Sequence, residues 1–495
     1  MTQYTAPSAT ACRDEMDGDA PGSGRRVLIS IPTGFQLRQF VHSGVLDLLL
    51  EQGFHVLVVS PNREGEGFAA RLPSGRVQVA AVDLKNGPLL RRYWAARHRL
   101  LLRGEPTQTL RDKTLRLHGN YPWVAQAAEI GNRLLRPYPA LRETFLRWER
   151  FILSDKAIDA VLSAHPVDLI LLGSPGFMAQ DAVLLHAGVD RGIPVAAAVL
   201  SWDNLSSKGL INPMPDRLLV WSNHMRQEAI RLQQIPAERI VESGAPLYDV
   251  FANPERFGSR ADNLQRLGLD PERRLILYGT NHAAHFPDEI EVVKQVARWV
   301  EEDGFDVPCQ LWIRLHPQAV SGPYKVLLEP YTKLASDRVK VEFPQVRKSD
   351  LLWDLPKEDI GHLVSLLRDS DVVINMASTL AIDAAIFDKP VICIAYDPSG
   401  PLAYEKSVRR YYDFTHMANV VRAGSATLVT SHDHLKEIIS AYLADPTLNR
   451  KERQSIVEQQ FGRVDGRSSE RLVSEVVALV SSQTDRRVAT QRCKS

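Results

Sequence analysis

The sequence predicts an α/β protein made of two lobes of similar size, each built on a parallel sheet. Apolar, β-branched segments alternate with helical patterns from residue 26 to 246, and a second such series runs from residue 274 to 479. Strand–helix–strand units of this kind build parallel sheets with right-handed crossovers. Residues 253–271, between the two series, are rich in polar and turn-forming residues, so we expect the lobe boundary there. Both lobes are therefore predicted to be Rossmann-like.

The first lobe begins with the segment RVLISIPT, whose continuous apolar run is typical of a strand that is buried on both faces. A helical pattern follows and ends at Gly53, and the next apolar segment ends at Pro61. The predicted strands of this lobe cover residues 26–33, 54–61, 78–84, 168–175, 193–202, 215–222 and 239–246. Helices are expected at residues 179–192 and 224–233.

Residues 85–151 interrupt this alternation and form a basic insert that we predict to be helical. They contain fourteen Lys and Arg against five Asp and Glu, with Trp, Tyr and Phe interleaved. One interpretation is a platform for an anionic, lipid-linked acceptor at the inner face of a membrane. The other is a solvated insert that packs its aromatic residues on the first lobe. Nucleic acid is disfavoured as a partner, because no DNA- or RNA-binding motif accompanies the charge.

The second lobe is predicted to contain the strands 274–280, 309–315, 338–343, 371–377 and 389–396, with helices at 288–303, 361–369 and 379–387. A final helix is expected at Arg467–Leu479. The predicted domains are a disordered leader (1–25), the first lobe (26–255), the second lobe (272–465), the final helix (466–480) and a disordered tail (481–495).

Composition and missing motifs exclude several classes of protein. The formal net charge is +1, which gives no general affinity for polyanions. The four cysteines form no CxxC, which disfavours a zinc ribbon and fits free thiols in a reducing cytoplasm. No apolar segment reaches the roughly 18 residues of a membrane span, and the N-terminal residues lack the apolar part of a secretory signal. P-loop, GxGxxG, GxSxG and HExxH motifs are also missing.

Polar residues follow three predicted strands of the second lobe, at the sheet edge where open α/β sheets bind ligands. The segment after the first of these strands reads Gly279, Thr280, Asn281 and His282. The glycine permits close backbone approach, and the other three offer hydrogen-bond donors. After the next strand, Arg314 and His316 lie on the same side of the chain, and such a pair binds phosphate. The alternatives are a capped turn for the first segment and a structural ion pair of Arg314 beside a half-buried His316 for the second.

The third polar segment runs directly from a strand into a helix that Ser378 or Thr379 caps. Free N–H groups and the helix dipole attract anions at such a place. Asp383 lies one turn later and is placed to accept a hydrogen bond from a ribose or a sugar. An ordinary helix cap is the alternative. Three such segments at one sheet edge favour phosphate recognition.

Three stretches of this lobe resemble a known family. RLHP at 314–317, the run DVVINMASTLAIDAAIFDKPVICIAYD at 371–397 and DGRSSER at 465–471 are similar, in this order, to motifs of the CDP-glycerol glycerophosphotransferases that build teichoic-acid-type polymers. More broadly, residues 272–475 resemble GT-B glycosyltransferases, including the HP-motif sialyl- and Kdo-transferases that use CMP-sugars. The family has a TDYSS-like turn where this chain has NMAST, and a PTYR-like segment where it has GTNH. The transferred unit is therefore left open between a sugar and glycerol phosphate.

The resemblance implies a GT-B-like fold, in which two Rossmann-like lobes face each other across a cleft and the first lobe carries the basic helical insert. It makes Arg314 and His316 ligands of the donor phosphate, and Ser378 and Thr379 partners of the second phosphate. It also implies that the final helix crosses back to the first lobe. Gly279, Thr280, Asn281, His282 and Asp383 complete the predicted donor site.

The first lobe is then expected to bind the acceptor. Its loop SWDNLSSKG at 201–209, followed by PDRLLVWS and GAPLYD, looks like a loop of bacterial surface-carbohydrate biosynthesis proteins. The predicted acceptor-binding residues are Gly34, Arg38, Asn204 and Lys208. The predicted catalytic residues are His316, with Asp203 as a general base on an acceptor hydroxyl and His42 as a rival base. An Asx-turn is the alternative for Asp203, and a surface or core position is the alternative for His42.

The sequence thus predicts an enzyme that moves a sugar or glycerol-phosphate unit from a CDP-, CMP- or UDP-linked donor to a hydroxyl of a glycan or lipid-linked acceptor, in bacterial cell-surface polysaccharide synthesis. We expect no cofactor and no essential metal, and a cytoplasmic protein with peripheral contact to the inner face of the membrane. Two alternatives stay open. One is a UDP-GlcNAc 2-epimerase-like enzyme with a carboxylate base and no acceptor, and the other is a non-catalytic GT-B scaffold.

Overall fold

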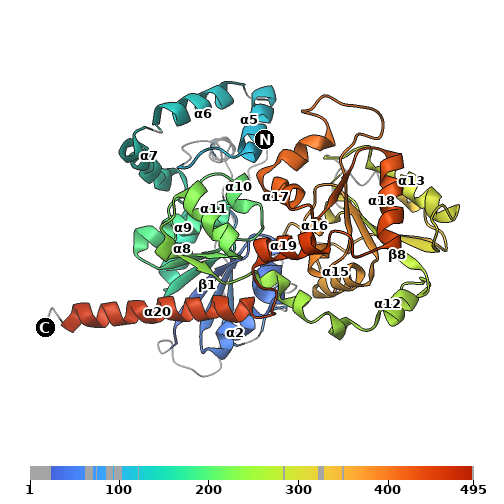
Figure 1. Ribbon diagram of the computed structural model, residues 1–495. Coiled ribbons are helices and arrows are strands. Elements are labelled where there is room, and N and C mark those ends of the chain that lie inside the picture. The colour runs from blue at the N-terminus through green and yellow to red at the C-terminus, as the bar shows by residue number, and fades with distance from the viewer. Residues whose placement is uncertain are drawn as a thin grey trace, which may run out of the picture.

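The computed structural model describes residues 24–61, 68, 71–73, 75–84, 93, 103–120, 122–135, 137–282, 285–320, 328–347 and 351–492. Its two parallel sheets form two lobes that lie side by side (Figure 1). This arrangement confirms the predicted α/β fold with two lobes. Nearly all of the predicted leader lies outside the described residues, as do residues 493–495 of the predicted tail.

The first lobe is built on a seven-stranded sheet in the order β3-β2-β1-β4-β5-β6-β7, with every neighbouring pair parallel. Its strands are β1 (Arg26–Ser30), β2 (His55–Ser60), β3 (Val77–Ala81), β4 (Leu169–Leu172), β5 (Val195–Ala198), β6 (Arg217–Val220) and β7 (Ile240–Glu242). Each lies within or close to a segment predicted from its apolar run. The central strands β1 and β4 are buried along nearly their whole length, because helices cover both faces.

The two faces of this sheet carry different helices. One face packs on α8 (Lys156–Ala164), α9 (Ala179–Arg191) and α11 (Asn223–Gln233), and the other on α1 (Gly34–Leu37), η1 (Arg38–His42), α2 (Val45–Glu51) and α20 (Ser468–Arg492). Side chains alternate along β1, so Leu28 belongs to the first core and Val27 and Ile29 to the second. Both faces of the first sheet are thereby covered.

The described part of the basic insert is helical, as predicted. It forms α5 (Gln108–Asn120), α6 (Pro122–Leu135) and α7 (Pro139–Ile152), which lie at one edge of the first lobe (Figure 1, upper left). Pro122 and Pro139 stand at the first positions of α6 and α7, where a missing backbone N–H has no cost. The prolines therefore start these helices and separate them from one another.

Several short helices lie in a loop of the first lobe and in the segment that connects the two lobes. They are α10 (Asn204–Ser207), η2 (Ala237–Arg239), η3 (Pro246–Ala252), η4 (Pro254–Phe257) and α12 (Arg260–Arg266). No helix among the described residues has both the length and the hydropathy needed to cross a bilayer.

The second lobe is built on a six-stranded parallel sheet in the order β10-β9-β8-β11-β12-β13. Its strands are β8 (Arg274–Gly279), β9 (Cys309–Arg314), β10 (Val339–Glu342), β11 (Val372–Asn375), β12 (Val391–Ile394) and β13 (Thr427–Val429). Its helices are α13 (Glu289–Glu301), η5 (Pro317–Val320), α14 (Glu329–Thr332), α15 (Lys357–Asp369), α16 (Leu380–Ile386), η7 (Val408–Asp413), α17 (Thr415–Ala423), α18 (His432–Ala444) and α19 (Arg450–Phe461).

Helix α20 closes the chain. It packs against α2 of the first lobe, with Leu472 and Val476 fully buried among apolar residues of that lobe. The helix continues to Arg492, whereas the sequence predicts a disordered tail from Ser481. The residues after Val480 are mostly polar, so they lack the apolar stripe from which the extra turns of this helix could have been predicted. Figure 1 shows the end of α20 projecting away from the body of the molecule.

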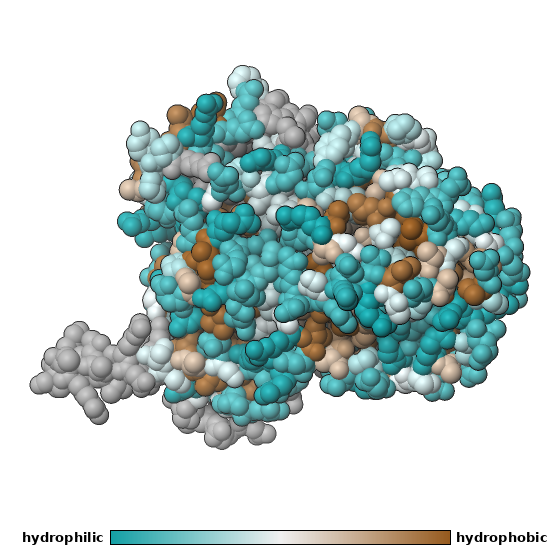
Figure 2. Space-filling view, viewed as in Figure 1, coloured by the Kyte–Doolittle hydropathy of each residue, from teal (hydrophilic) through white to brown (hydrophobic). Residues whose placement is uncertain are grey.

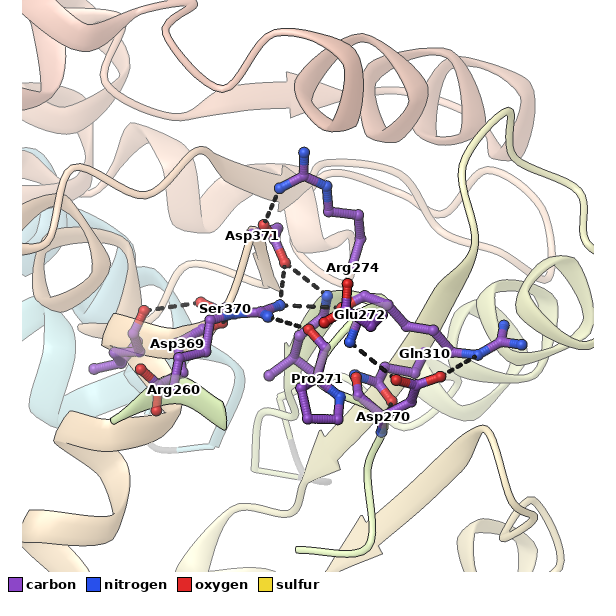
Figure 3. Close-up of polar contacts among 12 residues, drawn as sticks. Arg260, Asp270, Pro271, Glu272, Arg274, Gln310, Asp369, Ser370 and Asp371 are labelled. Atoms are coloured by element: carbon purple, nitrogen blue, oxygen red, sulfur yellow. Dashed lines mark hydrogen bonds and ion pairs between the residues drawn. The ribbon is translucent and has the colours of Figure 1, made fainter. Parts of the chain in front are cut away.

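The segment between the lobes is anchored to the second lobe at the amino-terminal ends of its strands (Figure 3). The guanidinium of Arg260 donates hydrogen bonds to the carbonyl oxygens of Asp369, Pro271 and Arg273 and to the carboxylate of Asp371. Asp371 also accepts from the side chain of Arg274, at 2.9 Å. This network lies at the opposite sheet edge from the polar segments described above, so it serves stability rather than ligand binding.

Replacing Arg260 by alanine is expected to lower the free energy of unfolding by about 2–3 kcal/mol, because three carbonyls and one carboxylate lose a charged donor. The measurement is urea unfolding followed by circular dichroism. Arg256→Ala is the matched control, because this exposed arginine only lies over the ring of Phe257. Equal midpoints for the two variants would contradict the anchoring role.

Candidate functional site

The predicted donor site lies at the point of the second sheet where the strand order reverses, between β8 and β11. β8 is hydrogen-bonded to β9 on one side and to β11 on the other. Right-handed crossovers send α13 and α16 to opposite faces of the sheet from this point. The carboxyl ends of β8 and β11 are thereby left uncovered between the helices, which is where open α/β sheets bind ligands.

Hydrogen bonds join the three polar segments into one assembly. The Asn281 side-chain amide donates to the carbonyl oxygen of Met376 at 2.6 Å, which ties the end of β8 to the end of β11. The hydroxyl oxygen of Thr280 accepts from the backbone N–H of His316 at 3.0 Å, which ties β8 to β9. The structure therefore brings together segments that are far apart in the sequence, at the sheet edge that was predicted.

Gly279 is required by packing at this junction. A Cβ atom at this position would lie 2.0 Å from Cδ1 of Leu380, the first residue of α16. The glycine lets β8 and α16 approach each other closely, which sets the spacing between the polar segments. The sequence suggested close approach of a ligand here, and the observed neighbour is a side chain of the protein.

The imidazole of His316 is held in one tautomer. Its Nδ1 accepts a hydrogen bond from the backbone N–H of Gln318 at 3.1 Å, so in the neutral ring Nε2 carries the proton. Burial, with the nearby His282 and His285, lowers the pKa of His316 to about 4. The ring is therefore neutral at pH 7 and presents Nε2–H as a hydrogen-bond donor.

Histidine and tyrosine rings continue from His316 along the edge of the lobe. The centroids of His316 and His282 are 6.1 Å apart, those of His282 and His285 are 5.4 Å apart, and Tyr411 lies 5.6 Å from His285. His285 and Tyr411 were not among the predicted site residues. His285 follows His282 by three residues, which is the one sequence signal that was available.

Ser378 and Thr379 stand at the start of α16. The Ser378 hydroxyl accepts from the backbone N–H of Leu380 at 3.3 Å, and its own N–H donates to the Asn375 side chain at 3.2 Å. Thr379 is exposed, and its side chain makes no capping hydrogen bond. This end of the helix therefore offers hydroxyl and backbone donors to a ligand.

Asp383 and Arg314 have protein partners in the structure. The Asp383 carboxylate accepts from the Tyr248 hydroxyl at 2.8 Å, and burial raises the pKa of Asp383 to about 7. The Arg314 guanidinium makes two 2.8 Å bonds to Asp359 and a further bond to Glu342. Arg314 thus forms the ion pair named as its alternative reading. Its role as a phosphate ligand and that of Asp383 toward a ribose stay predictions.

The predicted loop of the first lobe is organised around Asp203. One carboxylate oxygen accepts from Ser201 at 2.7 Å and from the Asn204 side chain at 3.2 Å, and the other accepts from Ser207. Burial alone would raise the pKa of Asp203, but the charges of His416 and Lys208 and the two serine hydrogen bonds lower it below the usual range. The carboxylate is therefore ionised and engaged within its own loop. Its function as a general base stays a prediction.

This loop and helix α5 of the insert both contact the second lobe. The ring of Trp202 in the loop meets that of His416 with centroids 4.9 Å apart. The backbone N–H of Thr415 donates to the hydroxyl of Thr109 in α5 at 2.9 Å. His416 and Thr109 were not predicted, because nothing in their own segments shows that these segments meet.

The other first-lobe residues lie on the turn after β1. The Gly34 N–H donates to the Leu352 carbonyl of the second lobe at 2.8 Å, and a Cβ at Gly34 would lie 2.0 Å from the Trp353 carbonyl oxygen. Burial is the main cause that lowers the pKa of His42 to about 4, and the positive charges of Arg38, Lys357 and Arg347 add to it. Gly34 therefore makes a contact between the lobes, and His42 is neutral at pH 7.

No metal site emerges from the residues in view. Across the described ranges, no group of three or more His, Cys, Asp or Glu side chains is placed to hold a metal ion.

Comparison with known proteins gives a family and a fold. The profile of the CDP-Glycerol:Poly(glycerophosphate) glycerophosphotransferase family matches residues 203–478. That range begins at Asp203 and contains the whole of the second lobe. A comparison with curated protein sequences gives no match.

Solved structures with a similar fold include UDP-GlcNAc 2-epimerase from Neisseria meningitidis bound to UDP-GlcNAc, with a TM-score of 0.53, 12% identity and coverage of 92% of this chain and 100% of that one. S. aureus MnaA with UDP has a TM-score of 0.53 and 12% identity, and the match covers 91% of this chain and 96% of that one. The wall teichoic acid polymerase TagF, as a variant soaked with CDPG, has a TM-score of 0.50 and 10% identity, and the match covers 93% of this chain and 90% of that one. At these identities the likeness shows the fold, a two-lobed GT-B arrangement.

The structure predicts that His316 keeps the Nε2–H tautomer from pH 8 down to about pH 5, because its pKa is lowered to about 4 and Gln318 donates to Nδ1. The measurement is a 15N-imidazole NMR titration, with the signals assigned through His316→Gln. Titration of this ring near its ordinary pKa of about 6.5, or a proton on Nδ1, would contradict the geometry.

Proposed function

The chain belongs to the CDP-glycerol:poly(glycerophosphate) glycerophosphotransferase family, and from this premise we propose that its second lobe binds a CDP-linked donor at the carboxyl ends of β8, β9 and β11. It is a transferase with a GT-B fold. The observation that carries the donor assignment is the assembly of Thr280, His316 and Ser378 at one sheet edge. These residues offer neutral hydrogen-bond donors beside a helix start, which suits a pyrophosphate.

The proposed reaction is attack of an acceptor hydroxyl oxygen on the β-phosphorus of the donor. A P–O bond forms to the acceptor, the bond from the β-phosphorus to the bridging oxygen breaks, and CMP leaves with that electron pair. The Nε2–H of His316 donates to the departing phosphate and stabilises its charge without giving up a proton. Positioning and such electrostatic stabilisation supply most of the rate in phosphoryl transfer.

The proton of the acceptor hydroxyl needs a base, and the two predicted bases differ in environment. The Nδ1 atom of His42 is buried without a hydrogen-bond partner, whereas both carboxylate oxygens of Asp203 accept hydrogen bonds within their loop. His42 is therefore the group that can take the proton without first breaking a bond. This assignment is part of the proposal.

The donor proposal predicts that CDP stabilises the protein in a thermal-shift experiment, also in the presence of EDTA. A ligand at 100 times its dissociation constant stabilises by about 2.7 kcal/mol, a shift of a few degrees.

His316→Ala is expected to abolish transfer from CDP-glycerol while leaving the unliganded melting temperature within a few degrees. His434→Ala, at a half-buried histidine on α18 outside the donor assembly, is the control.

Other outcomes of that experiment point elsewhere. A response to UDP alone, with acceptor-independent turnover of UDP-GlcNAc, would replace the proposal by the epimerase alternative. No response to any nucleotide would replace it by the scaffold alternative.

We further propose that helices α6 and α7 bind an anionic membrane surface, which would present a lipid-linked acceptor. Their exposed apolar side chains include Trp123, which is 83% exposed, and Trp148 and Phe151, which are each 65% exposed. Exposed Arg147 and Arg150 lie among them. Figure 2 shows apolar surface at this edge of the molecule, surrounded by hydrophilic residues. Apolar insertion combined with basic residues is the pattern of interfacial helices.

Changing Trp123 and Trp148 together to serine is expected to weaken binding to phosphatidylglycerol vesicles roughly tenfold, because two large rings leave the interface. The measurement is vesicle co-sedimentation at 0.1 M salt. The control changes Leu402 and Leu448, which are 43% and 41% exposed in the second lobe, to serine. If the tryptophan variant binds as well as this control, the helices do not contact the membrane.

A further inference from the structure

The short helix α10 forms part of the loop of Asp203, and its carbonyl groups need partners from outside the helix. The last four carbonyls of any helix lack a partner within it, and α10 has only four residues. Ser206 and Ser207, at its carboxyl end, are buried. A buried carbonyl without a partner costs about as much free energy as a lost hydrogen bond. The groups that donate to these carbonyls therefore decide whether the loop keeps its shape.

The first lobe supplies the donors for the first two carbonyls of α10. The backbone N–H of Lys208 donates to the Asn204 carbonyl at 3.1 Å. The side-chain amide of Gln233, on α11, donates to the Leu205 carbonyl at 3.1 Å. The two carbonyls at the carboxyl end of α10 are bound from a different part of the chain.

Helix α5 of the basic insert supplies the donors for those two carbonyls. The hydroxyl of Thr107, directly before α5, donates to the Ser206 carbonyl at 2.5 Å. The ammonium group of Lys113, within α5, donates to the Ser207 carbonyl at 2.8 Å. The Thr107 oxygen also accepts from the Leu110 N–H at 3.2 Å, so one hydroxyl caps α5 and joins it to α10. The start of α5 is thereby fixed to the end of α10.

The same helix also caps a helix of the second lobe. Helix α17 begins at Thr415, and its N-cap residue, Phe414, has no polar side chain to cap it. The Thr415 N–H donates instead to the hydroxyl of Thr109, which is fully buried in α5. The next residue, His416, packs its ring on Trp202 of the loop. Helix α5 therefore joins the loop to the part of the second lobe that faces it, and Figure 1 shows α5 above α10 and α17.

The contact of Lys113 reaches the carboxylate of Asp203 through a single residue. Ser207, whose carbonyl accepts from Lys113, donates its own hydroxyl to Asp203. Asp203 also accepts from Ser201 at 2.7 Å. Loss of the Lys113 hydrogen bond would free the main chain at Ser207 and displace the hydroxyl that holds the carboxylate. The position of Asp203 thus depends on a side chain of the insert.

We propose that Thr107, Thr109 and Lys113 are positioning residues, which keep the loop of Asp203 in its shape and against the second lobe. The insert then has a role in the transfer reaction that is separate from any contact with a membrane. The proposal rests on the proposed transferase function and adds to it the residues that set the geometry of this loop. They act through the loop and are not expected to touch the donor.

The first test follows the loop directly, in the full chain labelled with 5-fluorotryptophan. The chain has eight tryptophans, so the 19F NMR signal of Trp202 is assigned through Trp202→Phe. Lys113→Met keeps an unbranched side chain but removes the charged donor, and it is expected to shift the Trp202 signal by more than its line width. Lys113→Arg supplies a charged donor again and is expected to return the signal to the wild-type position.

The second test compares the same variants in transfer from CDP-glycerol to a short glycerol phosphate oligomer. Lys113→Met is expected to lower kcat at least about tenfold, because a hydrogen bond from a charged group is lost and the loop moves. The KM for CDP-glycerol is expected to stay within about twofold, because the donor site lies in the second lobe. Lys113→Arg is expected to recover most of the rate, which a general loss of stability would not explain.

The matched control is Arg111→Met, which removes a charged side chain from an exposed position of the same helix. It should leave the Trp202 signal and the rate of transfer unchanged. An unchanged Trp202 signal in Lys113→Met, or equal rates for Lys113→Met and Lys113→Arg, would overturn the proposal.

A second pair of variants decides the question if Lys113→Met does not fold. Thr109→Val removes the hydroxyl that accepts from Thr415 and should shift the Trp202 signal, whereas Thr109→Ser keeps a hydroxyl and should not. Equal signals for this pair would count against the proposal.

Failure of the donor proposal has a different signature. CDP would then give no thermal shift with the wild type and no transfer would occur, whereas the Trp202 signal would still respond to Lys113→Met. In that case the signal alone decides whether α5 holds the loop.

Discussion

The position of β8 between β9 and β11 is the constraint on which the donor site depends. Parallel strands end at one edge of the sheet, so this order alone brings Thr280, His316 and Ser378 close together. The hydrogen bond from Asn281 to the Met376 carbonyl and the contact of Gly279 with Leu380 then fix the spacing between neighbouring segments. A slip in strand register would separate them, and no single side chain could restore the site.

Burial decides which groups carry charge at the junction of the lobes. His316 and His42 are neutral at pH 7 because burial and neighbouring basic groups lower the pKa of each to about 4. Arg314 keeps its charge because two carboxylates surround it. The protein thus offers neutral donors where it is proposed to bind a pyrophosphate. Neutral donors there also avoid the cost of burying charge before the donor arrives.

Sequence patterns predicted most of the fold. Apolar segments, continuous or alternating with polar residues, marked every strand but β13. Helices α17, α18 and α19 were not predicted; α19 shows why, since its sequence RKERQSIVEQQF is polar on nearly every side. The polar segments at strand ends were also visible, because each is continuous in sequence. Their partners were not visible. Asp383 meets Tyr248 across 135 positions and Arg314 meets Asp359 across 45, and only the folded chain brings such pairs together.

The contact at Gly34 has a consequence for how this molecule tolerates change. There the main chain of one lobe meets the main chain of the other, through the Gly34 N–H and the Leu352 carbonyl. A Cβ atom at position 34 would lie 2.0 Å from the Trp353 carbonyl oxygen, so this approach of two main chains requires glycine. Any other residue at position 34 would push one main chain away from the other, and the backbone it meets has no side-chain end that could move aside. The spacing of the lobes at this point therefore depends on the absence of a single carbon atom.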